Sequence, residues 1–177
     1  MKTLLLLRHA KSDWDAAYSD DHARPLAERG LKAARKMGRW ATSIGLVPDQ
    51  ALASTALRAR QTLALAAEAG GWGGVARLTD ALYEATPEAV LAEIRATPDD
   101  VGVLVVVGHE PTTSRLVSLL IGGGAVEIKT AAAARVDVPV MRWADVAPAR
   151  GVLAALVPPG AFEPGVYRDL KKAADGE

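Results

Sequence analysis

The chain has 177 residues; half are hydrophobic, about a quarter are charged, and Lys plus Arg equal Asp plus Glu. This size fits one domain, residues 1–177, and the balanced charge excludes a global attraction to nucleic acid or to an anionic membrane. No apolar segment approaches the ~20 residues of a membrane span, no leader is predicted, and the absence of cysteine excludes disulfides and thiol catalysis, so we expect a cytoplasmic protein.

Short apolar runs alternate with segments of helical periodicity along the chain. In order, the pattern predicts a strand at 3–7, a long polar loop at 10–25, a helix from 26 that ends at Gly45, a strand at 50–54, a helix at about 56–69, a strand at 75–78, a helix at about 87–96, a strand at 101–107, a helix from 111 to about 121, and strands at 132–138 and 152–157. A polar tail follows from about residue 164. Alternating strands and helices predict an α/β fold, a three-layer α/β/α sandwich around a mostly parallel sheet.

Local signals refine two of these elements. The run at 101–107 is apolar without alternation, which is typical of a central strand covered on both faces. Ser54 or Thr55 is the predicted N-cap of the helix at 56–69, because short hydroxyl side chains can accept from the first free backbone N–H groups of a helix.

Two of the three histidines directly follow buried strands. "LLLLRH" ends in Arg8 and His9, and "LVVVGH" ends in His109. Ligands of open α/β sheets bind at the carboxyl ends of the strands, so the two histidines face one crevice if their strands are neighbours. Either histidine alone is better interpreted as a structural residue; the pair together with Arg8 favours a functional site.

An arginine in the first turn of a helix adds to this pattern. In "LASTALRARQT", Arg58 follows a strand and begins a helix, where it opposes the helix dipole. That position is explained if an anion lies in front of it, since a guanidinium group matches a phosphoryl group with two parallel hydrogen bonds. Arg60 is expected on an exposed face.

Competing motifs fail on inspection. His109–Glu110 begins like the zinc-protease HExxH, but Thr113 occupies the place of the second histidine. Neither glycine cluster completes G-x-G-x-x-G, and the phosphate-loop and G-x-S-x-G motifs are absent. We expect no metal site and no cofactor.

The segments "RHAKS", "DDHARPLAERG", "STALRARQT" and "VVVGHEP" resemble the histidine phosphatase superfamily, also called phosphoglycerate mutase-like. The short chain, the Arg24–Pro25–Leu26 element and "TAAAARVDV" resemble its small bacterial phosphohistidine phosphatase branch, the SixA type. The resemblance extends to about residue 160.

The resemblance implies a role for each matching position. His9 corresponds to the histidine that is phosphorylated during turnover, Arg8 and Arg58 to arginines that clamp phosphate, and His109 to the second active-site histidine. Glu84, in "LYEATPE", falls where larger relatives carry an acidic proton donor; an exposed loop glutamate is the alternative.

Two positions in the long loop are assigned to substrate binding, Ser12 and Arg24. A loop salt bridge with Asp20 or Asp21 is the alternative for Arg24. Larger members often have asparagine where this chain has Asp15, and a carboxylate would repel phosphate there, so we expect Asp15 to point away. The chain also lacks room for the insertions of mutases, which favours a simple phosphatase.

The expected function is therefore phosphoryl hydrolysis in two steps through a phosphohistidine enzyme, without metal. The partner is a phosphorylated protein or a small phosphorylated substrate, not nucleic acid or membrane; the oligomeric state is open. One alternative is a phosphatase of a small metabolite on the same fold. Another, from a different class, is a non-catalytic phosphate-binding or adaptor protein.

Overall fold

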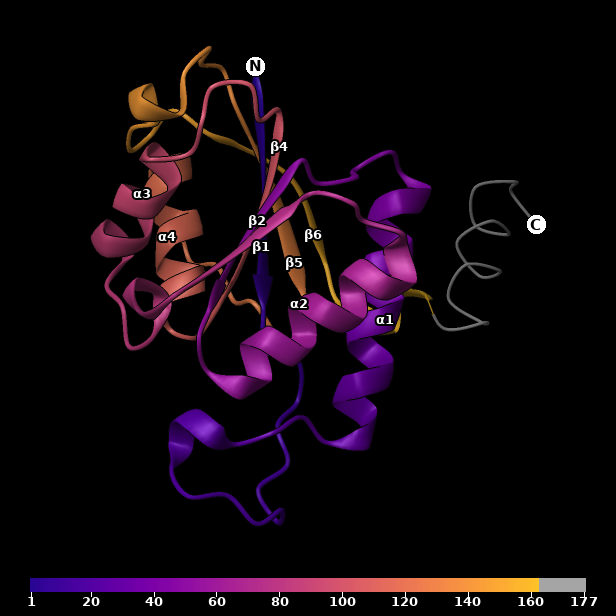
Figure 1. The fold of residues 1–177 in the computed structure, drawn as a ribbon. Coiled ribbons are helices and arrows are strands. Elements are labelled where there is room, and N and C mark those ends of the chain that lie inside the picture. Colours follow the sequence, from indigo (N-terminus) through magenta and orange to yellow (C-terminus); the bar gives the residue numbers. More distant parts are fainter. Residues whose placement is uncertain (163–177) are drawn as a thin grey trace, which may run out of the picture.

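The computed structural model describes residues 1–162 and contains a six-stranded mixed sheet (Figure 1). The strand order is β3-β2-β4-β1-β5-β6. The first four strands in this order are parallel, β5 is antiparallel to β1, and β6 is antiparallel to β5. The strands are β1 (Lys2–Arg8), β2 (Gln50–Ser54), β3 (Val75–Thr79), β4 (Val103–Gly108), β5 (Ala133–Val138) and β6 (Val152–Val157).

Four helices cover the two faces of the sheet, α1 and α2 on one and α3 and α4 on the other (Figure 1). Leu5 and Leu7 of β1 pack into the apolar core beneath α1 and α2, whereas Leu4 and Leu6 pack into the opposite core. Successive side chains of a strand point to opposite faces, so a run of leucines supplies both cores. The predicted three-layer α/β/α fold is confirmed. The helices are α1 (Glu28–Ser43), α2 (Leu57–Gly70), α3 (Pro87–Arg95) and α4 (Thr112–Ile121).

The strand predicted at 101–107 is β4, which lies between β2 and β1 with its four central residues fully buried. Its neighbour β1 is also buried, and the two run in parallel with Arg8 opposite Gly108. A strand covered by helices on both faces needs apolar side chains at every position, which explains the two unbroken runs.

The prediction for the N-cap of α2 is wrong. The cap residue is Ala56, which makes no side-chain capping bond. The Ser54 hydroxyl accepts from the backbone N–H of Ala56 before the helix begins, and the Thr55 hydroxyl bonds instead to Asp80 and His22. Neither hydroxyl is therefore available to the first turn.

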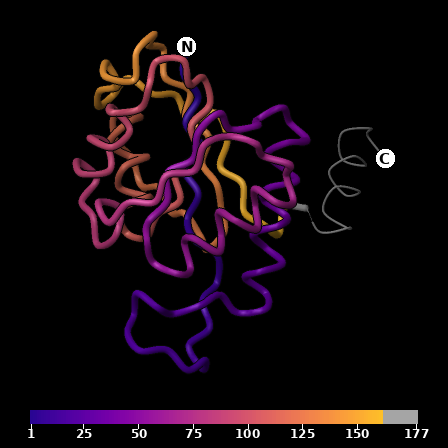
Figure 2. Tube along the Cα trace, viewed as in Figure 1, coloured from indigo at the N-terminus to yellow at the C-terminus, as the bar shows by residue number. Residues whose placement is uncertain are grey.

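The loop that follows β1 is closed at its base and extends below the sheet (Figure 2). Ser12 and Leu26 form a β-bridge, and the backbone N–H of Ala27 donates to Lys11 O at 2.9 Å. A short 3₁₀ turn, η1 (Asp21–Ala23), lies within it. This loop carries Arg24 and begins at His9, so its closed base fixes both near the end of β1.

Three further 3₁₀ turns complete the described chain: η2 (Asp80–Leu82), η3 (Trp143–Asp145) and η4 (Pro159–Phe162). The polar tail predicted from about residue 164 lies outside the described residues. Among residues 1–162, no helix is long and apolar enough to cross a membrane.

Candidate active site

The pairing of β1 with β4 brings His9 and His109 together. The backbone N–H of His9 donates to Gly108 O at 3.0 Å, and the two imidazole ring centroids lie 5.1 Å apart. Both rings lie at the carboxyl end of the parallel strands, as expected if the strands were neighbours.

The orientation of the His9 ring is set by a local hydrogen bond. Its Nδ1 lies 2.8 Å from the carbonyl oxygen of Ala10, so Nδ1 carries the proton and donates it. Burial, together with the charges of Arg58 and Arg8, lowers the pKa of His9 to about 4. The ring is therefore neutral near pH 7, and its Nε2 keeps a free electron pair, which is what a nucleophile requires.

Arg58 lies in the first turn of α2, with only 5% of its surface exposed. Thr62, one turn later, donates its hydroxyl to Arg58 O at 2.7 Å and accepts from the backbone N–H of Ala10 at 3.0 Å. This residue therefore ties the start of α2 to the loop that holds His9. Arg60 is exposed.

Several polar atoms near the strand ends are buried without a hydrogen-bond partner: the donors Arg8 Nε and Arg58 Nε, and both ring nitrogens of His109, of which one carries a proton in the neutral ring. Arg8 is held in place by its other end, where a terminal nitrogen donates to Ile128 O at 2.9 Å. Buried polar groups are almost always paired in folded proteins. Unpaired cationic donors beside a neutral histidine suit an anion with several oxygens, such as a phosphoryl group.

His109 is also held neutral. Burial, then the neighbouring His9 and Arg58, lower its pKa to about 3. Its backbone is fixed by Thr113, whose N–H and hydroxyl both donate to His109 O, at 2.9 and 2.8 Å. A neutral imidazole can donate one N–H to a bound phosphoryl oxygen without competing for a proton with His9.

Arg24 forms the ion pair that the sequence left as an alternative. Its terminal nitrogen lies 2.6 Å from Asp21 Oδ1, and its guanidinium stacks on Trp14, 3.5 Å from the ring centre. The side chain is buried and its Nε has no partner. Charge from Arg24 also contributes to the lowered pKa of His9, so Arg24 belongs to the electrostatic surroundings of the site.

The remaining predicted positions differ in burial. Ser12 is buried and its hydroxyl has no partner. Glu84 is exposed, with a left-handed backbone at φ 49°. Asp15 is exposed, in keeping with the expectation that it points away from phosphate.

Three side chains at this site, Asp21, Tyr83 and His22, had no predicted site role; Asp21 was expected only as a possible salt-bridge partner of Arg24. Asp21 accepts hydrogen bonds from Arg24, Arg58 and Tyr83. The Tyr83 ring makes edge contacts with His109 and with His22, the third histidine. The acid three residues before Arg24 was a signal for Asp21, but nothing local connects Tyr83 to the strand ends.

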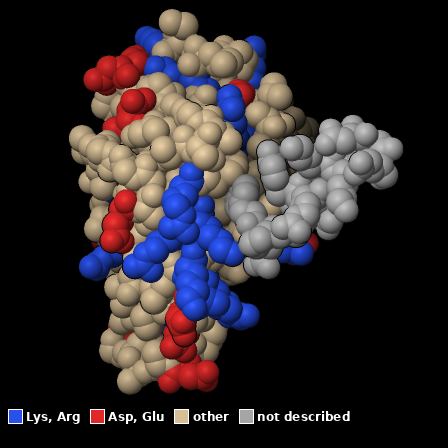
Figure 3. All heavy atoms as spheres, turned by 90° about the vertical axis from the view of Figure 1, so that its right-hand side faces the viewer, with Lys and Arg blue, Asp and Glu red and all other residues tan. Residues whose placement is uncertain are grey.

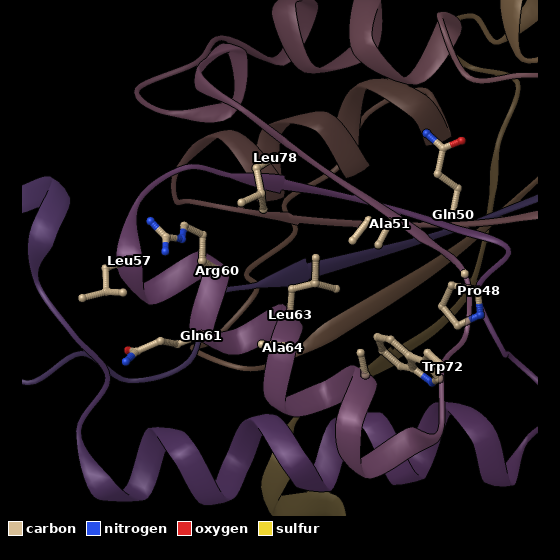
Figure 4. A pocket seen from close by; sticks show the side chains of 13 residues that line it. Pro48, Gln50, Ala51, Leu57, Arg60, Gln61, Leu63, Ala64, Trp72 and Leu78 are labelled. Carbon is tan, nitrogen blue, oxygen red and sulfur yellow. The ribbon is translucent and has the colours of Figure 1, made fainter.

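An apolar cavity of about 430 Å³ lies elsewhere (Figure 4). It opens between α2 and the β2–β3 edge, where Pro48, Leu63 and Trp72 line it, and it includes neither histidine. On the α1 side, Lys and Arg side chains gather on the surface (Figure 3), and Lys11, Arg29, Lys32 and Lys36 line a cavity of about 480 Å³. Neither cavity presents the neutral histidine pair found at the strand ends.

No group of three or more His, Cys, Asp or Glu side chains within residues 1–162 is arranged to hold a metal ion. The positive charge at the site comes from arginines.

The family model for the histidine phosphatase superfamily (branch 1) matches residues 4–88. An uncharacterized protein of Mycobacterium tuberculosis is 47% identical over 117 residues, 64% of this chain and 69% of the relative.

Two solved structures are similar over nearly their whole length. A protein assigned as the phosphohistidine phosphatase SixA of Nakamurella multipartitia is 31% identical, with a TM-score of 0.77 over 89% of this chain and 96% of that one. The protein histidine phosphatase SixA complexed with tungstate is 25% identical, with a TM-score of 0.79 over 91% and 99%. The chain therefore belongs to the histidine phosphatase superfamily, in its SixA-like branch.

Proposed function

We propose that this phosphatase hydrolyses phosphohistidine on a protein, through a covalent phosphohistidine at His9 and without a metal ion. The observation that carries the proposal is the state of His9: a buried, neutral imidazole whose Nδ1 proton is donated to Ala10 O. A site that only bound phosphate would have no use for a histidine presented in this way. The non-catalytic alternative is therefore disfavoured.

In the first step, His9 Nε2 attacks phosphorus and forms a P–N bond, while the bond from phosphorus to the leaving group breaks and its electron pair departs with that group. Arg8 and Arg58 neutralise charge on the phosphoryl oxygens, and neutral His109 donates a hydrogen bond to one of them, as the charge spreads in the transition state. The Ala10 carbonyl stabilises the positive charge that develops on the His9 ring.

In the second step, water attacks phosphorus and the P–N bond to His9 breaks. The electron pair returns to Nε2, the proton stays on Nδ1 in its hydrogen bond to Ala10 O, and both protons of the water remain on the phosphate product, H2PO4−. The lowered pKa of His9 favours this step, because a ring that resists protonation departs as neutral imidazole.

The leaving group distinguishes phosphohistidine from a phosphate ester. An alkoxide leaving group requires a proton donor, and general acid catalysis typically raises the rate ~10²–10⁴-fold. An imidazole that is already protonated leaves without the help of a proton donor. The candidate acid, Glu84, is exposed, which supports a P–N substrate over an alkyl phosphate. The tungstate complex of the similar SixA structure supports oxyanion binding in this branch.

The test is turnover of a radiolabelled phosphohistidine peptide in the presence of a chelator, quenched with denaturant at alkaline pH, where the P–N bond survives. Wild type should retain acid-labile phosphate and full activity, and His9→Ala should retain neither. Label that persists in His9→Ala would place the nucleophile elsewhere, and activity lost on chelation and restored by a divalent ion would contradict the arginine clamp. A panel with phosphoserine and phosphotyrosine peptides and sugar phosphates tests the substrate class.

A further inference from the structure

A single carboxylate, that of Asp21, is bonded to two of the site arginines. Its Oδ1 accepts from Arg24 at 2.6 Å, and its Oδ2 accepts from Arg58 at 2.9 Å and from the Tyr83 hydroxyl at 3.1 Å. The backbone oxygen of Asp21 accepts from the other terminal nitrogen of Arg58 at 2.6 Å. Asp21 thus engages both outer nitrogens of Arg58, while Arg58 Nε is buried without a partner.

Asp21 lies on the outer side of this clamp. Its side chain is 49% exposed, against 7% for the side chains of Arg24 and Arg58. A carboxylate offers about four acceptor positions, and three side-chain donors use three of them. One acceptor position is therefore left for a group that enters from solvent.

Asp21 stays charged at the working pH of the site. Burial opposes its ionisation, but the hydrogen bond from Arg24 and the charge of Arg58 outweigh it and lower the pKa of Asp21 to about 2. A fixed negative charge beside a phosphoryl dianion weakens binding of the dianion unless the substrate brings positive charge of its own. Most phosphate esters do not.

Protonated phosphohistidine does bring that charge. We propose that Asp21 is a specificity-determining residue whose carboxylate accepts a hydrogen bond from the protonated distal nitrogen of the leaving imidazole. This inference rests on the proposed function and names the residue that selects the leaving group.

The charges balance in this transfer. The substrate ring carries a proton on its distal nitrogen and the phosphoryl group on the other, and His9 begins neutral. As the P–N bond of the substrate breaks and the P–Nε2 bond forms, the electron pair stays on the substrate ring, which leaves as neutral imidazole with its distal N–H. Phosphorylated His9 now carries the positive charge, next to Ala10 O. Asp21 would thus accept a hydrogen bond from the N–H of the departing ring, as the Ala10 carbonyl accepts one from the N–H of the His9 ring.

Asp21→Asn tests the proposal against two small substrates, phosphoimidazole, whose leaving ring can be cationic, and p-nitrophenyl phosphate, whose leaving group is anionic. We expect kcat/KM for phosphoimidazole to fall about 10- to 100-fold, the range for loss of a hydrogen bond to a charged group. For p-nitrophenyl phosphate, kcat/KM of Asp21→Asn should be unchanged or higher, and inorganic phosphate should inhibit this variant at least as strongly as it inhibits wild type. The matched control is Asp15→Asn, which removes the same charge from an exposed position of the same loop.

Equal losses on both substrates, with weaker inhibition by phosphate, would mean that Asp21 only positions Arg58 and would overturn the proposal. Asp21→Glu keeps the charge and should keep the wild-type ratio of kcat/KM for phosphoimidazole to kcat/KM for p-nitrophenyl phosphate. A ratio as low as in Asp21→Asn would also overturn the role of Asp21. Asp21→Glu replaces Asp21→Asn in the test if Asp21→Asn does not fold.

Wild type alone tests the proposed function. Failure of wild type to hydrolyse phosphoimidazole and the phosphohistidine peptide would reject both the proposed function and the role of Asp21. Good turnover by wild type, with an unchanged ratio in Asp21→Asn, would reject the role of Asp21 alone.

Discussion

Arg58 and Arg60 lie two residues apart on α2 in different surroundings. Arg58 is buried and bonded to Asp21 with its Nε unpartnered, whereas Arg60 is exposed. In the proposed function, Arg58 is a preorganised donor for a phosphoryl oxygen, and removal of such a donor typically costs about 10²–10³ in rate.

We therefore expect Arg58→Ala to lower kcat/KM about 10²–10³-fold and Arg60→Ala to change it within about twofold, the scale of an ordinary surface substitution. Steady-state kinetics on one substrate measures both. Arg58→Lys separates charge from geometry, since lysine lacks the planar fork and should recover only part of the loss. Similar losses in the two alanine variants would contradict the assignment.

Glu84 is the residue on which the two enzymatic alternatives differ. Since its side chain is exposed and a protonated imidazole needs no donor, Glu84→Gln should change turnover of a phosphohistidine peptide only slightly. Wild type should be slow on an alkyl phosphate. A preference of wild type for a sugar phosphate, abolished by Glu84→Gln, would establish the metabolite phosphatase instead.

At the level of elements, α1 packs directly against the backbone of the loop that follows β1. Gly30 lies in α1 where a Cβ would overlap the carbonyl oxygen of Lys11, the same oxygen that accepts from Ala27. Helix and loop can approach this closely only because Gly30 has no side chain. This contact fixes the chain two residues beyond His9.

Gly30→Ala should therefore lower both stability and activity. Alanine favours a helix over glycine by about 1 kcal/mol, but forcing a methyl group into a packed contact typically costs about 1–3 kcal/mol and would displace Lys11. Gly73→Ala is the control, because a Cβ at Gly73 meets no atom within 4 Å. Thermal unfolding and kcat measure the two effects; a Gly30→Ala protein as stable and active as the control would contradict the account.

On the scale of the whole molecule, two buried neutral histidines make stability depend on pH. Folding lowers the pKa from 6.5 to about 4 for His9 and to about 3 for His109. At pH values between the folded pKa and 6.5, the unfolded chain binds more protons than the folded chain. The contribution of the two neutral histidines to the free energy of unfolding is therefore complete above pH 6.5 and is lost as the pH falls. Asp21, lowered from 3.8 to about 2, adds a loss only below about pH 3.8.

We expect the free energy of unfolding to decrease from pH 6.5 toward pH 4, by up to about 1.4 kcal/mol per pH unit for each histidine. Denaturant unfolding at a series of pH values measures the slope, and His9→Gln should flatten it. A free energy that is constant from pH 7 to pH 4.5 would show that the histidines are not held neutral by the fold.

Much of the fold could be predicted, because its signals are local. Unbroken apolar runs indicated β1 and β4, and Pro87 marked the start of α3. The same runs predicted that Arg8–His9 and His109 follow strand ends, and the position of Arg58 early in a helix followed from its own segment. These features depend on side-chain periodicity within a few residues, which a sequence displays directly.

The N-cap of α2 and the surroundings of Asp21 could not be predicted in this way. Thr55 bonds to Asp80, 25 residues away, and Asp21 accepts from Arg58 at 37 residues and from Tyr83 at 62. A hydroxyl or carboxylate forms hydrogen bonds with whichever polar groups the fold brings close, and the distance along the sequence does not predict which groups these are.

The sequence by itself determined the order of strands and helices, the α/β class, and which strands deliver histidines and arginines to loops. Only the tertiary structure decided that β4 lies beside β1, so that His9 and His109 meet, and that burial keeps both rings neutral. Parallel strands pair through crossovers whose order is set by packing of the whole sheet, and a pKa depends on the groups and the solvent around a side chain. The strand order and the pKa values both depend on which residues are neighbours in space, and no local pattern along the chain shows which residues those are.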